Sequence, residues 1–327
     1  MPEDPEISAE IRVPEISVIV PHLNQPELLG LLLASLHAQD FDMRRAEVIV
    51  VDNGSRVLPE AVVAGFPGVT LAVEPIPGPG PARNRGIGLA RAPIVAFTDG
   101  DCQVARSWLA TILRHFAADP GLAVLGGDMQ LILPDPGNPT AVEAYECVYA
   151  FPQTFYIHRL GYSVTANMAA RRSVLDAVGP FLGIGVSEDR EWGQRARAMG
   201  HVTRWKPDVI VRHPARRTMD ELCDKCDRNV SLDFTEVRGL AGRAKWTAKA
   251  LALGVSPLAA IPKIARSDRV AGFHARRLAF QGLAGFRLYR AKRMLQALVS
   301  EEVRTASTRW NRTDRGMAGQ DATNRQD

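Results

Sequence analysis

Residues 94–101 read IVAFTDGD, a short apolar run followed at once by two carboxylates one residue apart. The β-branched and aromatic side chains predict a strand that is buried on both faces. Asp99 and Asp101, at the end of that strand, offer the hard oxygen ligands that Mg²⁺ and Mn²⁺ prefer. Asp-Gly-Asp is also a common turn sequence, so the motif alone leaves a purely structural role open.

Three further apolar runs of the same kind precede this one. They lie at residues 17–21, 47–51 and 69–73, and leucine-rich or Gly-rich segments with helical character separate them. Strand and helix therefore alternate four times before residue 101. This alternation predicts an α/β fold, with a doubly wound, mostly parallel central sheet that carries helices on both faces.

Polar residues follow three of the four predicted strands. Asn24 comes after the first strand, Asp52 after the second, and Asp99 with Asp101 after the fourth. In sheets of this class, ligands bind outside the carboxyl ends of the strands. We therefore expect these groups to converge on one pocket that holds a cation and a nucleoside diphosphate. For Asp52 an Asx turn or a helix cap is the alternative.

A Gly- and Pro-rich loop at residues 75–81 enters a predicted helix over 82–91. The N-terminus of such a helix favours phosphate oxygens, and Arg83 lies in its first turn. The loop is not a dinucleotide fingerprint, because Arg83 stands where the third glycine would be, and no Walker lysine is present. A plain helix start with surface arginines is the alternative.

Two single residues stand out in the second half of the chain. Asp189 lies in the first turn of a helix predicted over 188–199, where a carboxylate could take a proton from an attacking hydroxyl. Acids are, however, favoured in any first helical turn. His213 follows a strand predicted over 209–212, and a neutral imidazole is a competent Mn²⁺ ligand. A histidine before a proline is also an ordinary loop residue.

Four cysteines without a secretory signal predict reduced thiols in a cytoplasmic protein. Cys223 and Cys226 form only one closely spaced pair, so a zinc site is not expected. We expect no transmembrane helix, because the apolar segment 246–262 is short and is interrupted by Lys249 and Pro257.

The positive charge of the chain is concentrated near its C-terminal end. The net charge is +4, and residues 238–298 hold thirteen Lys and Arg but one acid, Asp268. Because the excess is confined to one region, we expect no nucleic-acid partner. Basic, apolar helices suit an anionic membrane surface, which predicts a protein peripheral to the inner face of the cell membrane. A helical cap on the core is the alternative.

The ordered set of motifs resembles glycosyltransferase family 2, a family of inverting enzymes with the GT-A fold. The matching segments read SVIVPHLN at 17–24, VIVVDNGS at 48–55, ARNRG at 82–86, FTDGD at 97–101, SED at 187–189 and VRH at 211–213. They occur in the order of the family and cover residues 16–213.

The resemblance implies a role for each matched residue. Asp189 would be the catalytic base of a single displacement, and Asp101 and His213 would bind Mn²⁺ or Mg²⁺. The implied donor-binding residues are Pro21, Asn24, Asp52, Arg83 and Asp99. The implied cofactors are that divalent metal and a UDP-, GDP- or dTDP-sugar donor, and the implied acceptor is a glycan or a lipid-linked hydroxyl.

The expected organisation is one GT-A domain with a C-terminal appendage. The expected parts are a disordered tail at 1–14, a nucleotide-sugar-binding half at 15–127, an acceptor-binding half at 128–237, a basic helical appendage at 238–303, and a second disordered tail at 304–327.

Two departures and two alternatives accompany this prediction. Asn53 stands where many members carry a second aspartate, and residues 194–197 do not fit the Gln-x-x-Arg-Trp motif of processive synthases. A sugar nucleotidyltransferase would need a Gly-rich basic loop directly after the first strand, where residues 21–25 read PHLNQ. A non-catalytic nucleotide-binding module with a GT-A fold is the second alternative.

Overall fold

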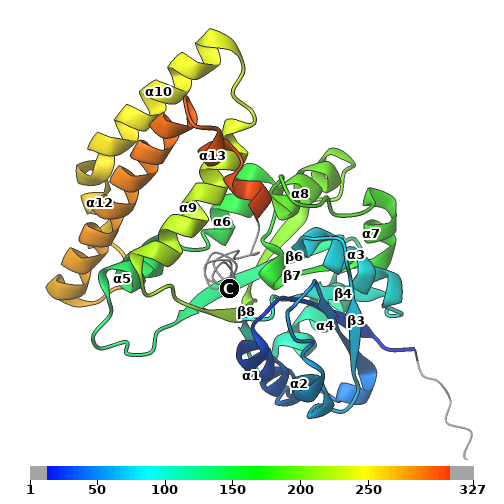
Figure 1. Ribbon diagram of the computed structural model, residues 1–327. Helices are drawn as coiled ribbons and strands as arrows, with labels where there is room; N and C mark the ends of the chain where they lie inside the picture. Colours follow the sequence, from blue (N-terminus) through cyan, green and yellow to red (C-terminus); the bar gives the residue numbers. More distant parts are fainter. Residues whose placement is uncertain (1–12, 310–327) are drawn as a thin grey trace, which may run out of the picture.

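A computed structural model describes residues 13–309 of the chain. Within them, one central sheet has the strand order β3-β2-β1-β4-β7-β6-β8-β5 (Figure 1). The strands are β1 (Ile16–His22), β2 (Ala46–Asp52), β3 (Val69–Val73), β4 (Ile94–Phe97), β5 (Gln103–Val104), β6 (Val124–Ile132), β7 (Met168–Arg171) and β8 (Thr203–Pro214).

The first four strands form the parallel half of the sheet. Their alternating side chains divide between two cores, so that Val18 and Val20 face one helical layer and Ile19 faces the other. The first layer contains α1 (Pro26–His37), α2 (Glu60–Ala64) and α4 (Trp108–Ala118), and the second contains α3 (Pro79–Leu89), α7 (Arg172–Val178) and α8 (Glu188–Ala198). The predicted doubly wound sheet is confirmed.

The other half of the sheet is mixed. Strand β7 pairs antiparallel with both β4 and β6, whereas β6 and β8 are parallel. Strand β6 was not expected, and β8, with 12 residues, extends the strand predicted over 209–212 in both directions. A register shift between Gly127 and Asp128 interrupts the β6–β8 pairing, and the expected division of the domain at 127–128 falls at this irregularity.

The C-terminal half of the chain adds a helical layer beside this domain (Figure 1). Helix α12 contacts α5, α9 and α10 along its length, and α10 runs beside it. The elements are α5 (Ala141–Tyr149), α6 (Gln153–Phe155), α9 (Met219–Phe234), α10 (Gly239–Val255), α11 (Ile261–Ala265), α12 (Gly272–Ala297) and α13 (Glu301–Arg304), with short turns η1 (Met43–Arg45), η2 (Tyr156–Leu160), η3 (Thr165–Asn167), η4 (Ser256–Ala260) and η5 (Ala306–Arg309).

Specific contacts fix α12 to its neighbours. A Cβ at Gly282 would lie 2.2 Å from the carbonyl oxygen of Ala141, so the backbones of α12 and α5 touch and only glycine fits. The indole nitrogen of Trp246 in α10 donates to the carbonyl oxygen of Met294 at 2.7 Å. Helix α12 therefore caps α5, as one of the two sequence alternatives held.

The segment Gly239–Ala265 bears on the expectation that no helix crosses a membrane. It is helical over 27 residues, and its most apolar 18-residue window has a mean hydropathy of 1.3, which by length and composition is enough to cross a membrane. Pro257 does not end the helix, because it lies in the first turn of η4, where a missing N–H costs nothing. Core helices of water-soluble proteins meet the same criterion, and 22% of that window is buried.

The first residues of the predicted disordered tail at 304–327 are ordered. Residues 304–309 continue in α13 and η5, and the hydroxyl of Ser307 is buried against that of Ser231 in α9 at 2.9 Å. The rest of that tail, and residues 1–12 of the first one, lie outside the described residues. All four cysteines are free, and Cys226 is buried in the core between α9 and α12.

Candidate active site

The polar residues at the strand ends converge as the sequence predicted. Strands β1 and β2 end in register, with His22 beside Asp52. After β4 the chain turns back toward β1, so that a Cβ at Gly100 would lie 3.2 Å from the carbonyl oxygen of Pro21. The donor-side candidates therefore share one edge of the sheet.

Asp52 is fully buried and its oxygens are engaged within the chain. It accepts hydrogen bonds from His22 Nδ1 at 2.9 Å and from the backbone N–H groups of Gly54 and Ser55 at 3.0 and 2.9 Å. Burial opposes ionisation, but these donors together lower the pKa of Asp52 below its usual range. This is the Asx-turn arrangement that stood as the alternative, and the nucleoside contact of Asp52 stays a prediction.

His22 is a site residue that the sequence analysis missed. Its Nδ1 donates to Asp52, and its Nε2 accepts from the backbone N–H of Gln25 at 3.2 Å, which fixes a neutral tautomer. The signal was available, because His22 ends a strand beside Asp52. Asn24 has a left-handed backbone with φ of 54°, and its side chain accepts from the N–H of Arg56 at 2.8 Å. It ties the two loops together.

Arg83 lies at the centre of the site and is 3% exposed. It donates to Asp99 Oδ1 at 2.7 Å and to Glu188 Oε1 at 2.9 Å, so it joins the end of β4 to the start of α8. Burial disfavours the charged guanidinium, yet the two carboxylates raise the pKa of Arg83 above its usual value. The alternative of a surface arginine is wrong.

Helix α3 also positions the loop that leads to α8. The side-chain amide of Asn84 donates to the carbonyl oxygen of Phe181 at 2.8 Å and accepts from its N–H at 2.9 Å. A Cβ at Gly80 would lie 1.9 Å from the carbonyl oxygen of Leu182, so glycine is required there. Residues 78–86 (GPGPARNRG) therefore fix the position of residues 181–188 through these contacts and the Arg83–Glu188 ion pair.

Asp101 and His213 form the second pair at the site. Asp101 Oδ2 lies 3.4 Å from His213 Nε2, and His213 Nδ1 lies 2.6 Å from the carbonyl oxygen of Pro214. A carbonyl only accepts, so Nδ1 carries the proton and Nε2 presents its lone pair toward the carboxylate. Burial opposes ionisation of Asp101, but a proton on Nε2, donated to the carboxylate, would lower the pKa of Asp101.

This pair fits a divalent cation. A carboxylate facing an imidazole lone pair requires a proton or a cation between them, and both groups are Mn²⁺ ligands. The described residues contain no group of three His, Cys, Asp or Glu side chains able to hold a metal ion. A cation bound by Asp101 and His213 would therefore take its remaining ligands from a substrate or from water.

Asp189 lies at the N-terminus of α8, next to Glu188. Its Oδ1 accepts from the hydroxyl of Ser187 at 3.0 Å and from the N–H of Arg190 at 2.7 Å. Burial and the negative charge of Glu188 raise the pKa of Asp189 to about 7. A carboxylate that titrates there is suited to general base catalysis near neutral pH.

The sequence analysis also missed Phe151, which lies beside His213, and Lys225, which lies beside Phe151. The ring of Phe151 is 5.0 Å from the imidazole, and the ammonium of Lys225 in α9 lies 5.3 Å from the Phe151 ring. Burial and the charge of Arg216 lower the pKa of Lys225 to about 8. The sequence around Lys225 does not mark it as a site residue. It lies between Cys223 and Cys226, and its burial depends on tertiary packing.

The chain also matches known proteins. The model of glycosyl transferase family 2 matches residues 17–178. The glycosyltransferase AglE of Haloferax volcanii is 31% identical over 210 residues, which are 62% of this chain and 68% of AglE. This chain belongs to glycosyltransferase family 2. Validoxylamine A glucosyltransferase of Streptomyces hygroscopicus is 30% identical over 159 residues, 47% of this chain and 37% of that enzyme.

Solved structures share the fold of this family 2 chain. A mannosyltransferase of Pyrobaculum calidifontis in complex with GDP-Man and Mn²⁺ superposes with a TM-score of 0.56 at 20% identity, over 89% of each chain. TarS of S. aureus in complex with UDP-GlcNAc gives 0.52 at 19% identity, over 87% of this chain and 91% of TarS. The fold is GT-A, and the chain is a glycosyltransferase rather than a sugar nucleotidyltransferase.

Proposed function

We propose that this family 2 chain is an inverting, divalent-metal-dependent glycosyltransferase. It moves a sugar from a UDP-, GDP- or dTDP-sugar to the hydroxyl of a glycan or lipid-linked acceptor. The observation that supports the proposal is the bridge through Arg83, which joins Asp99, two residues before Asp101, to Glu188, the neighbour of Asp189. The nucleotide sugars bound by the two solved GT-A structures support the class of donor.

Asp189 is the base in this mechanism. With a pKa of about 7, a large fraction of its carboxyl groups is ionised at neutral pH and still basic enough to accept a proton. It takes the proton of the acceptor hydroxyl as the hydroxyl oxygen bonds to the anomeric carbon. The bond to the diphosphate breaks on the opposite side, which inverts the configuration. One base suffices for one displacement.

Asp101 and His213 hold the divalent ion in this proposal. The ion, when bound, neutralises charge on the leaving nucleoside diphosphate. Pro214 fixes the imidazole through Nδ1, so that Nε2 is ready as a ligand. Imidazole ligation favours Mn²⁺ over Mg²⁺.

The donor-side residues recognise the nucleotide. Arg83 holds Asp99 at the end of β4, where the ribose would lie, and Pro21 and Asn24 form the adjoining loop. Asp52 would contact the base or ribose only if a nucleoside group replaces one of its internal hydrogen bonds. His22 is the donor that a nucleoside N–H could replace at the least cost, because it is a side chain.

Exchange of Asp189 for asparagine tests the proposed base. The amide keeps the size of the side chain but cannot accept the proton, so turnover should fall by about 10²–10⁴-fold. The measurement is release of nucleoside diphosphate from a panel of nucleotide sugars with Mn²⁺. Asp176→Asn on α7 is the matched control, because Asp176 pairs with Arg172 at the surface. Full turnover in Asp189→Asn rules out the proposed base.

We also propose that the chain acts in the cytoplasm at an anionic membrane surface, which residues 238–298 contact. Leu251, Val255 and Leu258 share one face of the Gly239–Ala265 helix and are 60%, 78% and 69% exposed. Exposed Lys245 and Lys249 lie on the same helix. Apolar residues flanked by lysines suit insertion at a headgroup boundary, where a lipid-linked acceptor would lie.

A further inference from the structure

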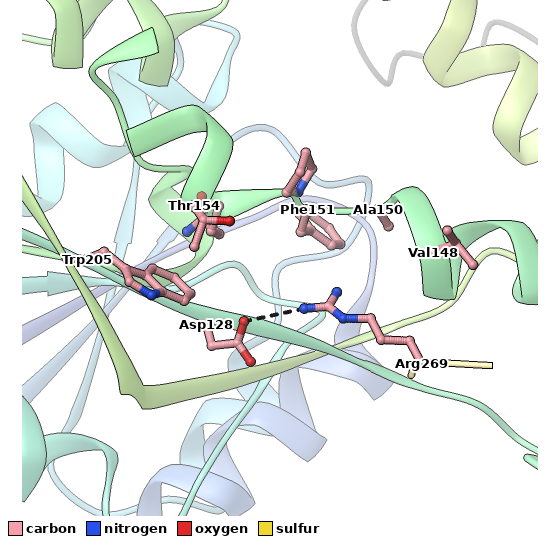
Figure 2. A pocket seen from close by; sticks show the side chains of 9 residues that line it. Asp128, Val148, Ala150, Phe151, Thr154, Trp205 and Arg269 are labelled. Carbon is pink, nitrogen blue, oxygen red and sulfur yellow. Dashed lines mark ion pairs between the residues drawn. The ribbon is translucent and has the colours of Figure 1, made fainter. Parts of the chain in front are cut away.

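A cavity lies beside strands β6 and β8, in the part of the chain that the sequence assigned to the acceptor (Figure 2). Its volume is about 200 Å³, and it is bounded by β6, β8, the segment after α5 and the loop between α11 and α12. The lining residues are Asp128, Val148, Ala150, Phe151, Pro152, Gln153, Thr154, Trp205 and Arg269.

The lining combines an aromatic surface with groups that bind hydroxyls. Trp205 is partly exposed and extends along one side of the cavity, toward Asp128 (Figure 2). Asp128 Oδ1 lies 3.8 Å from an Arg269 nitrogen, too far for a hydrogen bond, so both groups keep bonding capacity. A carboxylate and a guanidinium beside an indole can bind the polar edge and the apolar face of a sugar ring together.

Other polar groups of the lining are fixed by the fold. The amide of Gln153 donates to the carbonyl oxygen of Gly127 at 3.1 Å and to Ser163 Oγ at 3.0 Å, and its oxygen accepts from the N–H of Val164 at 3.2 Å. Gln153 therefore forms a rigid floor. The residues left to contact a ligand are Asp128, Thr154, Trp205 and Arg269.

Phe151 connects the cavity to the reaction centre. Its ring lines the cavity and also lies 5.0 Å from the ring of His213, which pairs with Asp101. Its backbone has φ of 46°, a strained conformation for a bulky residue that persists only where its surroundings impose it. The Phe151 ring is thus shared by the cavity and the proposed metal site.

We propose that this cavity is the acceptor subsite and binds one monosaccharide unit of a glycan, with Trp205 as its platform and Arg269 as a specificity-determining contact. This rests on the proposed transferase function. The volume is below the range of drug-sized ligand pockets, which suits a single ring. Asp128 would repel a phosphate, so the chemistry favours an uncharged, hydroxyl-rich ligand.

A structural role for the Asp128–Arg269 pair makes a different prediction. The Arg269 side chain is 47% exposed, and an exposed pair at 3.8 Å contributes little to folding. If the pair were only a surface contact, exchange of Arg269 would change neither unfolding nor sugar binding. If the cavity binds a sugar, exchange of Arg269 weakens binding and leaves unfolding unchanged.

The test measures binding of the methyl glycosides of glucose, mannose, galactose and N-acetylglucosamine to the full chain by saturation-transfer NMR. We expect at least one to bind the wild-type chain. Trp205→Ala and Arg269→Gln should weaken it by about tenfold or more, whereas Trp205→Phe keeps an aromatic platform and retains most binding. Arg266→Gln, an exposed position in the same loop, is the matched control and should bind as wild type.

Two results overturn the proposal: none of the four glycosides binds, or Arg269→Gln and Trp205→Ala bind as wild type does. Arg269 is exposed, so Arg269→Gln decides the question even if Trp205→Ala does not fold. UDP and GDP binding with Mn²⁺, measured on the same samples, reports on the donor site alone. If the wild-type chain binds UDP or GDP but none of the glycosides, only the proposed subsite is wrong. If it binds neither nucleotide, the result counts against the proposed function.

Discussion

The donor half and the acceptor half of this chain are built by different means. Around the donor edge, the charged groups have close partners. Asp52 accepts three hydrogen bonds, and Arg83 donates to two carboxylates. On the acceptor side, Asp189 and Lys225 have pKa values of about 7 and 8 because burial is not offset by a close opposite charge. The proposed nucleotide-binding edge is thus preorganised, whereas the proposed base, Asp189, is held where it titrates near neutral pH.

The largest expected effect is that of Arg83→Met. It leaves Asp99 and Glu188 facing each other without a cation, which should destabilise the fold by about 3 kcal/mol and abolish transfer. We take the lower end of the usual range because the carboxylate of Asp99 reaches solvent. Urea unfolding measures the first effect. Arg85→Met, on the same helix but exposed, should change stability by less than about 0.5 kcal/mol. Equal stability of the two variants would contradict a preorganised donor half.

Gly282→Ala comes next, with an expected loss of about 2 kcal/mol. The added Cβ would meet the backbone of Ala141 at 2.2 Å and must push α12 away from α5. Since this contact lies in the helical layer, nucleotide binding should persist while the layer becomes less stable, which hydrogen exchange resolves element by element. Gly285→Ala, where the nearest atom is the flexible end of Met219, is the matched control. Uniform loss of protection across the whole sheet would show that the halves do not differ in stability.

Asp189 should give both a pH profile and a stability change. Its folded pKa of about 7 lies above that of an exposed aspartate, so the folded state binds the proton more tightly. Stability should therefore fall as pH rises from about 4 to 7, and Asp189→Asn should remove this loss and stabilise the chain at pH 8, by the order of 1 kcal/mol.

Turnover has the opposite dependence on pH, because the base must be ionised. The rate should rise tenfold per pH unit below about 7 and level off above it. A rate that is flat between pH 5 and 8 would mean that the group titrating in the acceptor half is not the base.

The smallest effect concerns the membrane. Lys245→Gln should weaken binding of the full chain to phosphatidylserine liposomes by about fivefold at low salt, since one lysine near the surface is worth about 1 kcal/mol. Lys206→Gln on β8 is the control, because Lys206 lies on the sheet rather than on the helical layer. Equal co-sedimentation of the two variants would contradict the proposed contact between α10 and the membrane.

The sequence predicted the donor edge well because strand ends are local features. Asp99, Asp101 and His213 each follow an apolar run, and parallel strands bring such ends together without further information. The role of Arg83 was open, because its burial depends on Glu188, more than one hundred residues away.

The acceptor side could not be predicted in the same way. Strand β6 contains Gly126 and Gly127, which weaken a strand pattern, yet Gly127 is required because a Cβ would lie 2.2 Å from the carbonyl oxygen of Val209. Trp205 and Arg269 meet only through tertiary packing. The continuity of Gly239–Ala265 was missed because Pro257 was read as an interruption, whereas it begins a new turn.

The contact at Gly282 has a mechanical consequence. No side chain separates α12 from α5 at this contact. We therefore expect a movement of the 26-residue helix α12 to carry the short helix α5 with it. The end of α5 leads directly to Phe151, the aromatic wall beside His213. If docking of its neighbour α10 on a surface moves α12, we expect the movement to reach Phe151 and, through it, the proposed metal site.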